Sequence, residues 1–195
     1  MFTGIIEAQG LLQAITRTGA NKTFRISSPL SAGLKMDQSL SHDGVCLTVE
    51  SVSGDSHEVT AIAETLAKSR LNQWQPGDLI NLEQCVQLNG RLDGHIVQGH
   101  VDTVAVCLSR EDCDGSLEYR FEFPESFGHL VIEKGSVAIN GISLTCFEVT
   151  ENRFSVAIIP YTLEHTNMKS VIEGSVVNIE FDMIGKYVSR LASNF

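Results

Sequence analysis

Two short segments of this sequence contain side chains of the types that carry acid–base or nucleophilic chemistry. His95 precedes and His100 follows Gly99 in the segment GHIVQGH, and Cys46 lies in the segment DGVCLT. An imidazole titrates near neutral pH and can remove or deliver a proton. The alternatives are structural: a histidine held by hydrogen bonds, or a cysteine that serves as a small buried hydrophobe. The surrounding sequence is needed to choose between the catalytic and the structural interpretation.

No motif for a metal ion, a nucleotide or an organic cofactor is present in the sequence. The five cysteines are odd in number and include no CxxC pair, which argues against a disulfide framework and against a zinc site. There is also no phosphate-binding loop and no GxGxxG turn, the motifs that bind nucleotides. We therefore expect neither a cofactor nor a metal.

Composition narrows the class of protein further. The chain has 195 residues, of which 43% are hydrophobic and 19% charged, so it can bury a core. Its formal net charge of −10 argues against a nucleic-acid partner. The start MFTGIIEAQG lacks the basic region of a signal peptide, and no apolar run is long enough to cross a membrane. We expect a cytoplasmic protein with no membrane partner.

An internal repeat gives the candidate residues a context. Residues 36–83 align without a gap on residues 133–180, with roughly 12 identities in about 48 positions, where random pairing gives roughly three. Cys46 falls on Ser143, so the strand itself does not require a thiol. This difference between the copies favours a functional role for Cys46. A duplication also predicts two similar pockets.

Short alternating segments dominate both copies and predict strands. Residues 117–123 alternate strictly between apolar and polar side chains. Residues 45–52, 57–63, 104–109, 142–149 and 153–159 are rich in β-branched residues and are bounded by turn residues. Many short strands joined by turns indicate a barrel or a sandwich. The break between the copies falls near residues 88–92.

The tail has a different pattern. Ile184, Tyr187, Val188, Leu191 and Phe195 have the spacing of one face of a helix. That face packs either on its own barrel or on identical helices of other subunits, and the pattern does not separate the two.

Four segments in order resemble the riboflavin synthase family over essentially the whole chain. They are MFTGIIE (1–7), SLSHDGVCLTV (39–49), GHIVQGHVD (94–102) and INGISLT (139–145). The resemblance implies an all-β fold of two tandem homologous six-stranded Greek-key β-barrels plus a C-terminal α-helix. The expected units are a lumazine-binding barrel at 1–90, a second at 91–182 and an oligomerisation helix at 183–195.

The resemblance also implies an activity. Two molecules of 6,7-dimethyl-8-ribityllumazine would exchange a four-carbon unit, giving riboflavin and 5-amino-6-ribitylamino-pyrimidinedione without a cofactor. It implies a homotrimer with the active site between the N-barrel of one subunit and the C-barrel of its neighbour, and it suggests association with lumazine synthase. The rival hypotheses are a non-catalytic lumazine or flavin carrier of the same lineage and a flavin-binding barrel of a reductase. The second lacks support because the chain has no nucleotide-binding fingerprint.

Matched to the family's motifs, the catalytic candidates are Phe2, Ser39, Cys46 and His100, with Phe2 folding over the cleft. His95 and Asp182 are expected to be supporting residues. The substrate-binding candidates assigned to the first pocket are Gly4, Ile5, Ile6, Cys46, Leu47, Thr48, Thr60, Ala61, Ile62, Ala63, Glu64, Thr65, Gly99, His100 and Val101. Those assigned to the second are Lys134, Ser143, Leu144, Thr145, Ala157, Ile158, Ile159, Pro160, Tyr161 and Thr162.

Three positions depart from the family's pattern. Tyr161 stands where a glutamate is frequent, as Glu64 does in the first copy; Val45 replaces a cysteine seen in some members; and residues 91–93 stand where a second glycine is common. These departures leave the polarity at the mouth of the second pocket open.

Overall fold

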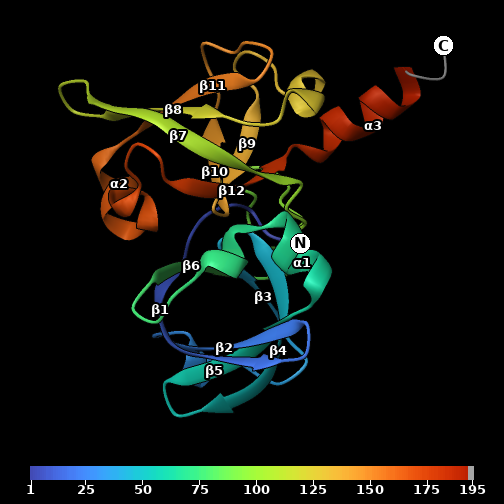
Figure 1. The fold of residues 1–195 in the computed structure, drawn as a ribbon, viewed down its shortest axis with the longest axis vertical. Helices are drawn as coiled ribbons and strands as arrows, with labels where there is room; N and C mark the ends of the chain where they lie inside the picture. Colours follow the sequence, from blue (N-terminus) through green and yellow to red (C-terminus); the bar gives the residue numbers. More distant parts are fainter. Residues whose placement is uncertain (193–195) are drawn as a thin grey trace.

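The computed structural model describes residues 1–192, which form two β-barrels stacked one on the other (Figure 1). Alternation of side chains drives strand formation. In β8 (Leu117–Glu122), Tyr119 and Phe121 are fully buried while Glu118, Arg120 and Glu122 are only partly covered. One face of such a strand can therefore enter a core while the other meets solvent.

The first barrel is closed. Its strands are β1 (Ala8–Thr18), β2 (Asn21–Ser27), β3 (Ser39–His42), β4 (Val45–Ser53), β5 (Ser56–Ala61) and β6 (Leu79–Gln84). They pair in the order β1-β2-β5-β4-β3-β6, and β1 also pairs with β6. Every pairing is antiparallel. Closure leaves no strand edge exposed for pairing with another chain.

The second barrel repeats this order. Its strands are β7 (Thr103–Asp112), β8, β9 (Ser136–Ile139), β10 (Ile142–Thr145), β11 (Arg153–Ile158) and β12 (Val176–Phe181). They follow the order β10-β9-β12-β7-β8-β11, which is the first barrel's cyclic order. The expected all-β fold of two six-stranded barrels with a C-terminal helix is confirmed.

One expected strand is shorter than its pattern indicates. A strand was expected over 142–149, but β10 ends at Thr145. The chain then turns, with Glu148 at a φ of +50°, a conformation that does not continue a strand. Between β10 and β11 only the isolated bridge of Phe147 with Ser155 remains. The second barrel is therefore not fully closed. It lacks a regular pairing between β10 and β11, whereas the equivalent strands β4 and β5 pair in the first barrel.

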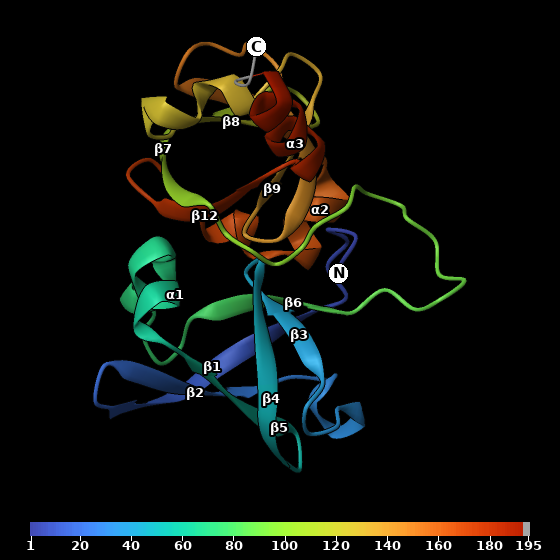
Figure 2. The same cartoon turned by 90° about the vertical axis from the view of Figure 1, so that its right-hand side faces the viewer.

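Short helices cap each barrel. α1 (Ala63–Lys68) follows β5, and α2 (Pro160–His165) follows β11 at the equivalent position. α3 (Met183–Ala192) leaves the second barrel and points away from it (Figures 1 and 2). Its Ile184, Tyr187, Val188 and Leu191 are 58–65% exposed. The expected contribution of Phe195 lies outside the described residues.

Within residues 1–192, none of the helices has both the length and the apolar character needed to cross a membrane.

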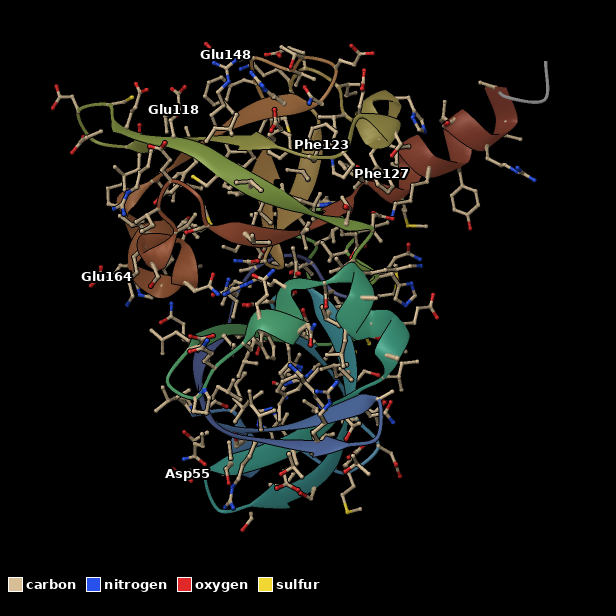
Figure 3. All side chains as sticks on the ribbon, viewed as in Figure 1. Asp55, Glu118, Phe123, Phe127, Glu148 and Glu164 are labelled. Carbon is tan, nitrogen blue, oxygen red and sulfur yellow. The ribbon has the colours of Figure 1, made fainter. Side chains whose placement is uncertain are left out.

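Each barrel has its own hydrophobic core. In the first, Phe24 meets Trp74 edge-on with ring centroids 5.0 Å apart. The second is built around aromatic rings, and Phe127 stacks on Phe181 at 5.4 Å. Figure 3 shows Phe123 and Phe127 on the side from which α3 leaves. The separate cores fit a duplication in which each copy holds its own barrel.

Buried amides join the two barrels with local twofold symmetry. Asn81 Nδ2 donates to the carbonyl of Asn140 at 3.0 Å, and Asn178 Nδ2 donates to the carbonyl of Asp43 at 2.9 Å. Asn81 and Asn178 occupy equivalent positions in the two copies, as do Asp43 and Asn140. All four residues are at most 1% exposed. Because a buried amide without a partner is costly, these reciprocal bonds fix how one barrel sits on the other.

A buried carboxylate completes this junction. Asp43 accepts hydrogen bonds from Asn81 N at 2.8 Å, Asn167 Nδ2 at 2.8 Å and Arg70 Nη1 at 3.0 Å. Burial raises the pKa of Asp43 to about 6, although Arg70 and the amide donors oppose that rise. In the second copy Asn140 stands in place of the aspartate. The junction is therefore symmetric in its hydrogen bonds but not in its charge.

Two histidines form a buried chain inside the first barrel. His42 Nδ1 faces only the carbonyl of Leu40, at 3.1 Å, so it carries the proton. His42 Nε2 therefore accepts from His57 Nε2 at 2.9 Å, and His57 Nδ1 accepts from the Ser31 hydroxyl at 2.8 Å. Burial lowers the pKa of His42 to about 3 and that of His57 to about 4. Both imidazoles are neutral in the folded protein.

This pair predicts an acid-sensitive first barrel. Above pH 6.5 the histidines are neutral in both states, but between pH 6.5 and about 4 the unfolded chain binds the protons and the folded chain does not. The two histidines should therefore lower the free energy of unfolding by about 3 kcal/mol each across that range. Asp43, whose pKa is raised to about 6, opposes part of this fall because the folded chain binds its proton first. Urea unfolding at several pH values measures this, with His57→Gln expected to flatten the slope. The exposed His129→Gln is the control, and equal slopes in wild type and His57→Gln would contradict the prediction.

Candidate active site

A cavity of about 230 Å³ lies beside β4 of the first barrel. Cys46 and His100 both line it, so the structure brings together two of the catalytic candidates. The lining residues are Val45, Cys46, Glu64, Thr65, Lys68, Ser69, Gly99, His100 and Val101. Lys68 and Ser69 were missed by the sequence reasoning, although they lie one helical turn after the matched residues Glu64 and Thr65.

A glycine segment closes this cavity against the strand. The amide of Cys46 donates to the carbonyl of Gly99 at 2.8 Å. A Cβ added at Gly99 would lie 2.5 Å from Cys46 Cβ, and Gly99 has a φ of +83°. Both the close approach and the left-handed conformation require glycine. The segment that carries His100 is thus held against the strand that carries Cys46.

The same arrangement is repeated in the second barrel. The amide of Ser143 donates to the carbonyl of Gly4 at 2.8 Å. A Cβ at Gly4, whose φ is +78°, would lie 2.6 Å from Ser143 Cβ. Ser143 is the counterpart of Cys46, so Gly4 is the counterpart of Gly99.

The second contact corrects an expectation. We assigned residues 4–6 to the first pocket, whereas Gly4 packs on Ser143 of the second barrel. The reason is that each barrel's leading segment crosses to the other barrel before its first strand begins. Figure 2 shows the connection between the barrels passing beside the N-terminal segment. Each glycine contact therefore combines a strand of one repeat with the leading segment of the other.

His95 lies beside Ser143, the counterpart of Cys46. Its Nδ1 is 2.6 Å from the Ser143 hydroxyl, and its Nε2 is buried without a hydrogen-bond partner. Burial lowers the pKa of His95, and the carboxylate of Asp182 opposes that effect. A neutral imidazole beside a hydroxyl can accept its proton. His95, which we expected to be a supporting residue, thus contacts the side chain equivalent to Cys46.

The thiol of Cys46 is half-buried. Burial raises its pKa, while a hydrogen bond with the side chain of Ser39 on β3 opposes the rise. The thiol is therefore protonated near neutral pH, so its form suits hydrogen-bond donation or proton transfer better than a preformed thiolate. Ser39, the remaining polar candidate on this face, is placed to orient that thiol.

Phe2 lies behind the pocket wall. Its amide donates to the carbonyl of Val97 at 2.7 Å, and its side chain is 1% exposed. The ring stands 2.9 Å from the position of a Cβ on Gly99. We expected Phe2 to fold over the cleft, whereas its ring supports the glycine segment from the buried side. The N-terminal segment pairs with the segment of Val97, and this pairing draws Phe2 inward.

Several binding candidates are buried in the cores or already hydrogen-bonded to other side chains. Leu47, Ala61 and Ile158 are 6%, 0% and 1% exposed and belong to the cores. The hydroxyl of Thr60 is bonded to Thr23 and Glu50 side chains. The exposed candidates are Ile5, Thr48, Ile62, Ala63, Glu64, His100, Lys134, Thr145, Ala157, Ile159, Pro160 and Tyr161, and the partly buried ones are Ile6, Thr65, Val101, Leu144 and Thr162.

The equivalent helices α1 and α2 differ in polarity. On α1, Lys68 forms an exposed ion pair with Glu64 at 3.1 Å. At the equivalent positions on α2, the rings of Tyr161 and His165 stack with centroids 4.0 Å apart. The departure at Tyr161 therefore replaces a charged pair by an aromatic one.

A larger groove of about 750 Å³ lies between α3 and the turn at Glu125–Leu130. Its lining is mainly apolar, with Leu130, Ile132, Ile184 and Val188, and Asp182 lies at its base. Asp182 Oδ1 accepts the amide of Ile184 at 3.0 Å, which explains a supporting role at the start of the helix.

In residues 1–192, no three His, Cys, Asp or Glu side chains converge as a metal-binding cluster.

Known proteins match this chain along its length. The family model of the lumazine binding domain matches twice, at residues 3–85 and 98–182. A riboflavin synthase of Mycobacterium bovis is 39% identical over 196 residues, covering 98% of each chain. A riboflavin synthase of Bacillus amyloliquefaciens is 36% identical over 191 residues, covering 97% of this chain and 89% of that one.

Solved structures share the fold. LumP complexed with riboflavin superposes with a TM-score of 0.87 at 20% identity, covering 93% of this chain and 99% of LumP. LumP complexed with 6,7-dimethyl-8-(1'-D-ribityl) lumazine superposes with a TM-score of 0.85 and the same coverage. At this identity the likeness supports the fold alone. The two domain matches and the nearly full-length identity to curated relatives show that the chain belongs to the riboflavin synthase family, with two lumazine binding domains in tandem.

Proposed function

We propose that this chain converts two molecules of 6,7-dimethyl-8-ribityllumazine into riboflavin and 5-amino-6-ribitylamino-pyrimidinedione. The observation that carries the proposal is the pair of equivalent glycine contacts, Gly99 on Cys46 and Gly4 on Ser143, in a chain of the riboflavin synthase family. Two identical substrates call for two similar pockets. Holding two reactants near attack geometry also removes several kcal/mol from a barrier.

The side chains at the pockets match the steps that the reaction needs. One lumazine loses a proton from its 7-methyl group, and the other accepts a nucleophile. His100 lines the first cavity and is exposed, so it can exchange a proton with a bound ring and then with solvent. At the second pocket the neutral His95 can take the proton of the Ser143 hydroxyl. The four-carbon unit leaves one substrate and joins the other, so no external oxidant is required.

We infer further that the protein works as a homotrimer. The apolar face of α3, with Ile184, Tyr187, Val188 and Leu191, has no covering element within residues 1–192. Identical helices packing through such faces would bury it. A subunit interface would also allow the first pocket of one chain to face the second pocket of another.

The alternative is a carrier that binds lumazine without turnover. The purified protein, incubated with 6,7-dimethyl-8-ribityllumazine and EDTA and without added cofactor, should form riboflavin and the pyrimidinedione in equal amounts by chromatography. The reaction needs only two substrates and side-chain proton transfer. A stable lumazine complex with no riboflavin would support the carrier instead.

Cys46→Ser should lower kcat by about tenfold to a hundredfold while changing lumazine affinity much less, because proton transfer by a positioned side chain is lost while the pocket's shape is kept. Steady-state kinetics and fluorescence titration separate the two effects. Cys113→Ser, at an exposed thiol on the β7–β8 turn, is the matched control. Equal losses in kcat and affinity would assign Cys46 to the fold.

The double variant Val188→Asp and Leu191→Asp should dissociate the trimer, since charges on the α3 face cannot be buried between helices. Light scattering should then report single chains. Met36→Asp, at a residue of the first barrel that is 67% exposed, is the control and should leave the assembly intact. A trimer that survives the double variant would place the subunit interface elsewhere.

A further inference from the structure

We propose that Glu83 and Glu180 are crossed positioning residues, each of which builds the ligand pocket of the barrel to which it does not belong. Neither was singled out as a site residue by the sequence, although they occupy the same position in the two copies. Both are on the last strand of their barrel, and they are 3% and 2% exposed. The consequence for turnover rests on the proposed function, whereas the positioning itself does not.

Glu180, on β12 of the second barrel, holds the segment that completes the first pocket. Its Oε1 accepts the amide of Gln98 at 2.7 Å, and its Oε2 accepts the amides of Gly99 and His100, each at 2.9 Å. Three consecutive backbone donors thus converge on one carboxylate. The segment that contains these donors includes Gly99, which contacts Cys46, and His100, which lines the cavity.

Glu83, on β6 of the first barrel, does the same for the second pocket. Its Oε1 accepts the amide and the hydroxyl of Thr3, both at 2.6 Å, and its Oε2 accepts the amide of Gly4 at 3.0 Å. Gly4 is the residue whose carbonyl binds the amide of Ser143. The two clamps are therefore related by the same local symmetry as the two pockets.

Burial raises the pKa of both glutamates, and the hydrogen bonds to each carboxylate oppose that rise. At Glu180 the more distant charge of Lys186 opposes it as well. Within residues 1–192, no Lys or Arg nitrogen lies within 4.0 Å of either carboxylate. Hydrogen bonds to a charged acceptor are stronger than those between neutral groups. A carboxylate accepts at both oxygens, whereas a glutamine amide would turn its NH₂ group toward a backbone N–H. Glu→Gln at either position therefore keeps the size, but it replaces one acceptor oxygen by a donor and removes the negative charge, which weakens the clamp.

The two clamped segments are also bonded to each other. Phe2 and Val97 exchange amide–carbonyl hydrogen bonds at 2.7 and 3.1 Å, and the amide of His95 donates to Thr3 at 3.1 Å. The result is one short antiparallel ribbon between the barrels, with Gly4 near one end and Gly99 near the other. A role limited to general stability would not predict which pocket each glutamate controls, but the crossed arrangement does.

Thiol alkylation tests this without reference to turnover. Glu180→Gln should raise the rate at which iodoacetamide modifies Cys46 by about tenfold, because the covering segment is released. Glu83→Gln should leave that rate unchanged. Mass spectrometry resolves each site, so the exposed Cys113 and the buried Cys146 of the same sample serve as internal references for reagent access and for global unfolding.

The reciprocal test uses a thiol placed by Ser143→Cys. In that background Glu83→Gln should raise the alkylation of the new thiol, and Glu180→Gln should not. If the glutamates act as proposed, Glu180→Gln and Cys46→Ser should also be non-additive in kcat/KM, while Glu180→Gln and Ser143→Ala should be additive.

Three results would overturn the proposal: unchanged Cys46 alkylation in Glu180→Gln, equal increases at both pockets in both variants, or a parallel increase at Cys146 that signals loss of the fold. If the wild-type protein showed no turnover but the variants kept the crossed alkylation pattern, the proposed function would be contradicted and the positioning role would not.

Discussion

The two equivalent sites, at Cys46 and at Ser143, depend on a close backbone approach at two glycines. The carbonyl of Gly99 can bind the amide of Cys46, and that of Gly4 the amide of Ser143, only because no Cβ intervenes. Each glycine lies in a segment that precedes one barrel in the sequence but packs against the other. Each site therefore needs a strand from one barrel and a glycine segment from the other, so the two repeats are not independent binding modules.

This dependence explains why the junction between the barrels is polar and reciprocal. The bonds between Asn81 and Asn140, and between Asn178 and Asp43, leave little freedom in how the barrels are oriented. A buried ion pair such as that of Asp43 with Arg70 adds little net stability, because desolvation offsets the attraction, and the raised pKa of Asp43 agrees with this. Removing one partner would nevertheless leave a buried group unpaired. The junction therefore contributes more to orientation than to stability.

Local patterns were enough to predict most of the strands and the terminal helix, because alternation and helical spacing are recorded in neighbouring residues. They left a barrel and a sandwich open, and only the resemblance to a family favoured two six-stranded barrels. They were not enough to assign Gly4 to the second pocket, since the crossing of the leading segments is a tertiary feature without a periodic signal. The inward position of Phe2 has the same cause. Glu83 and Glu180 did leave a signal: an identical acidic residue at matched positions of two buried strands, where a charge is rare unless it is paired. That signal has meaning only once the strands are known to be buried.

The two pockets share a backbone design and differ in their side chains. Cys46 is replaced by Ser143, which alone has a buried imidazole, His95, within hydrogen-bond distance. The ion pair on α1 is replaced by stacked rings on α2. Two identical substrate molecules do not differ in reactivity. The protein must therefore determine which of them donates the four-carbon unit and which accepts it. In the proposed reaction, duplication would provide matched positions for the two rings, and divergence at these few side chains would give the rings unequal surroundings.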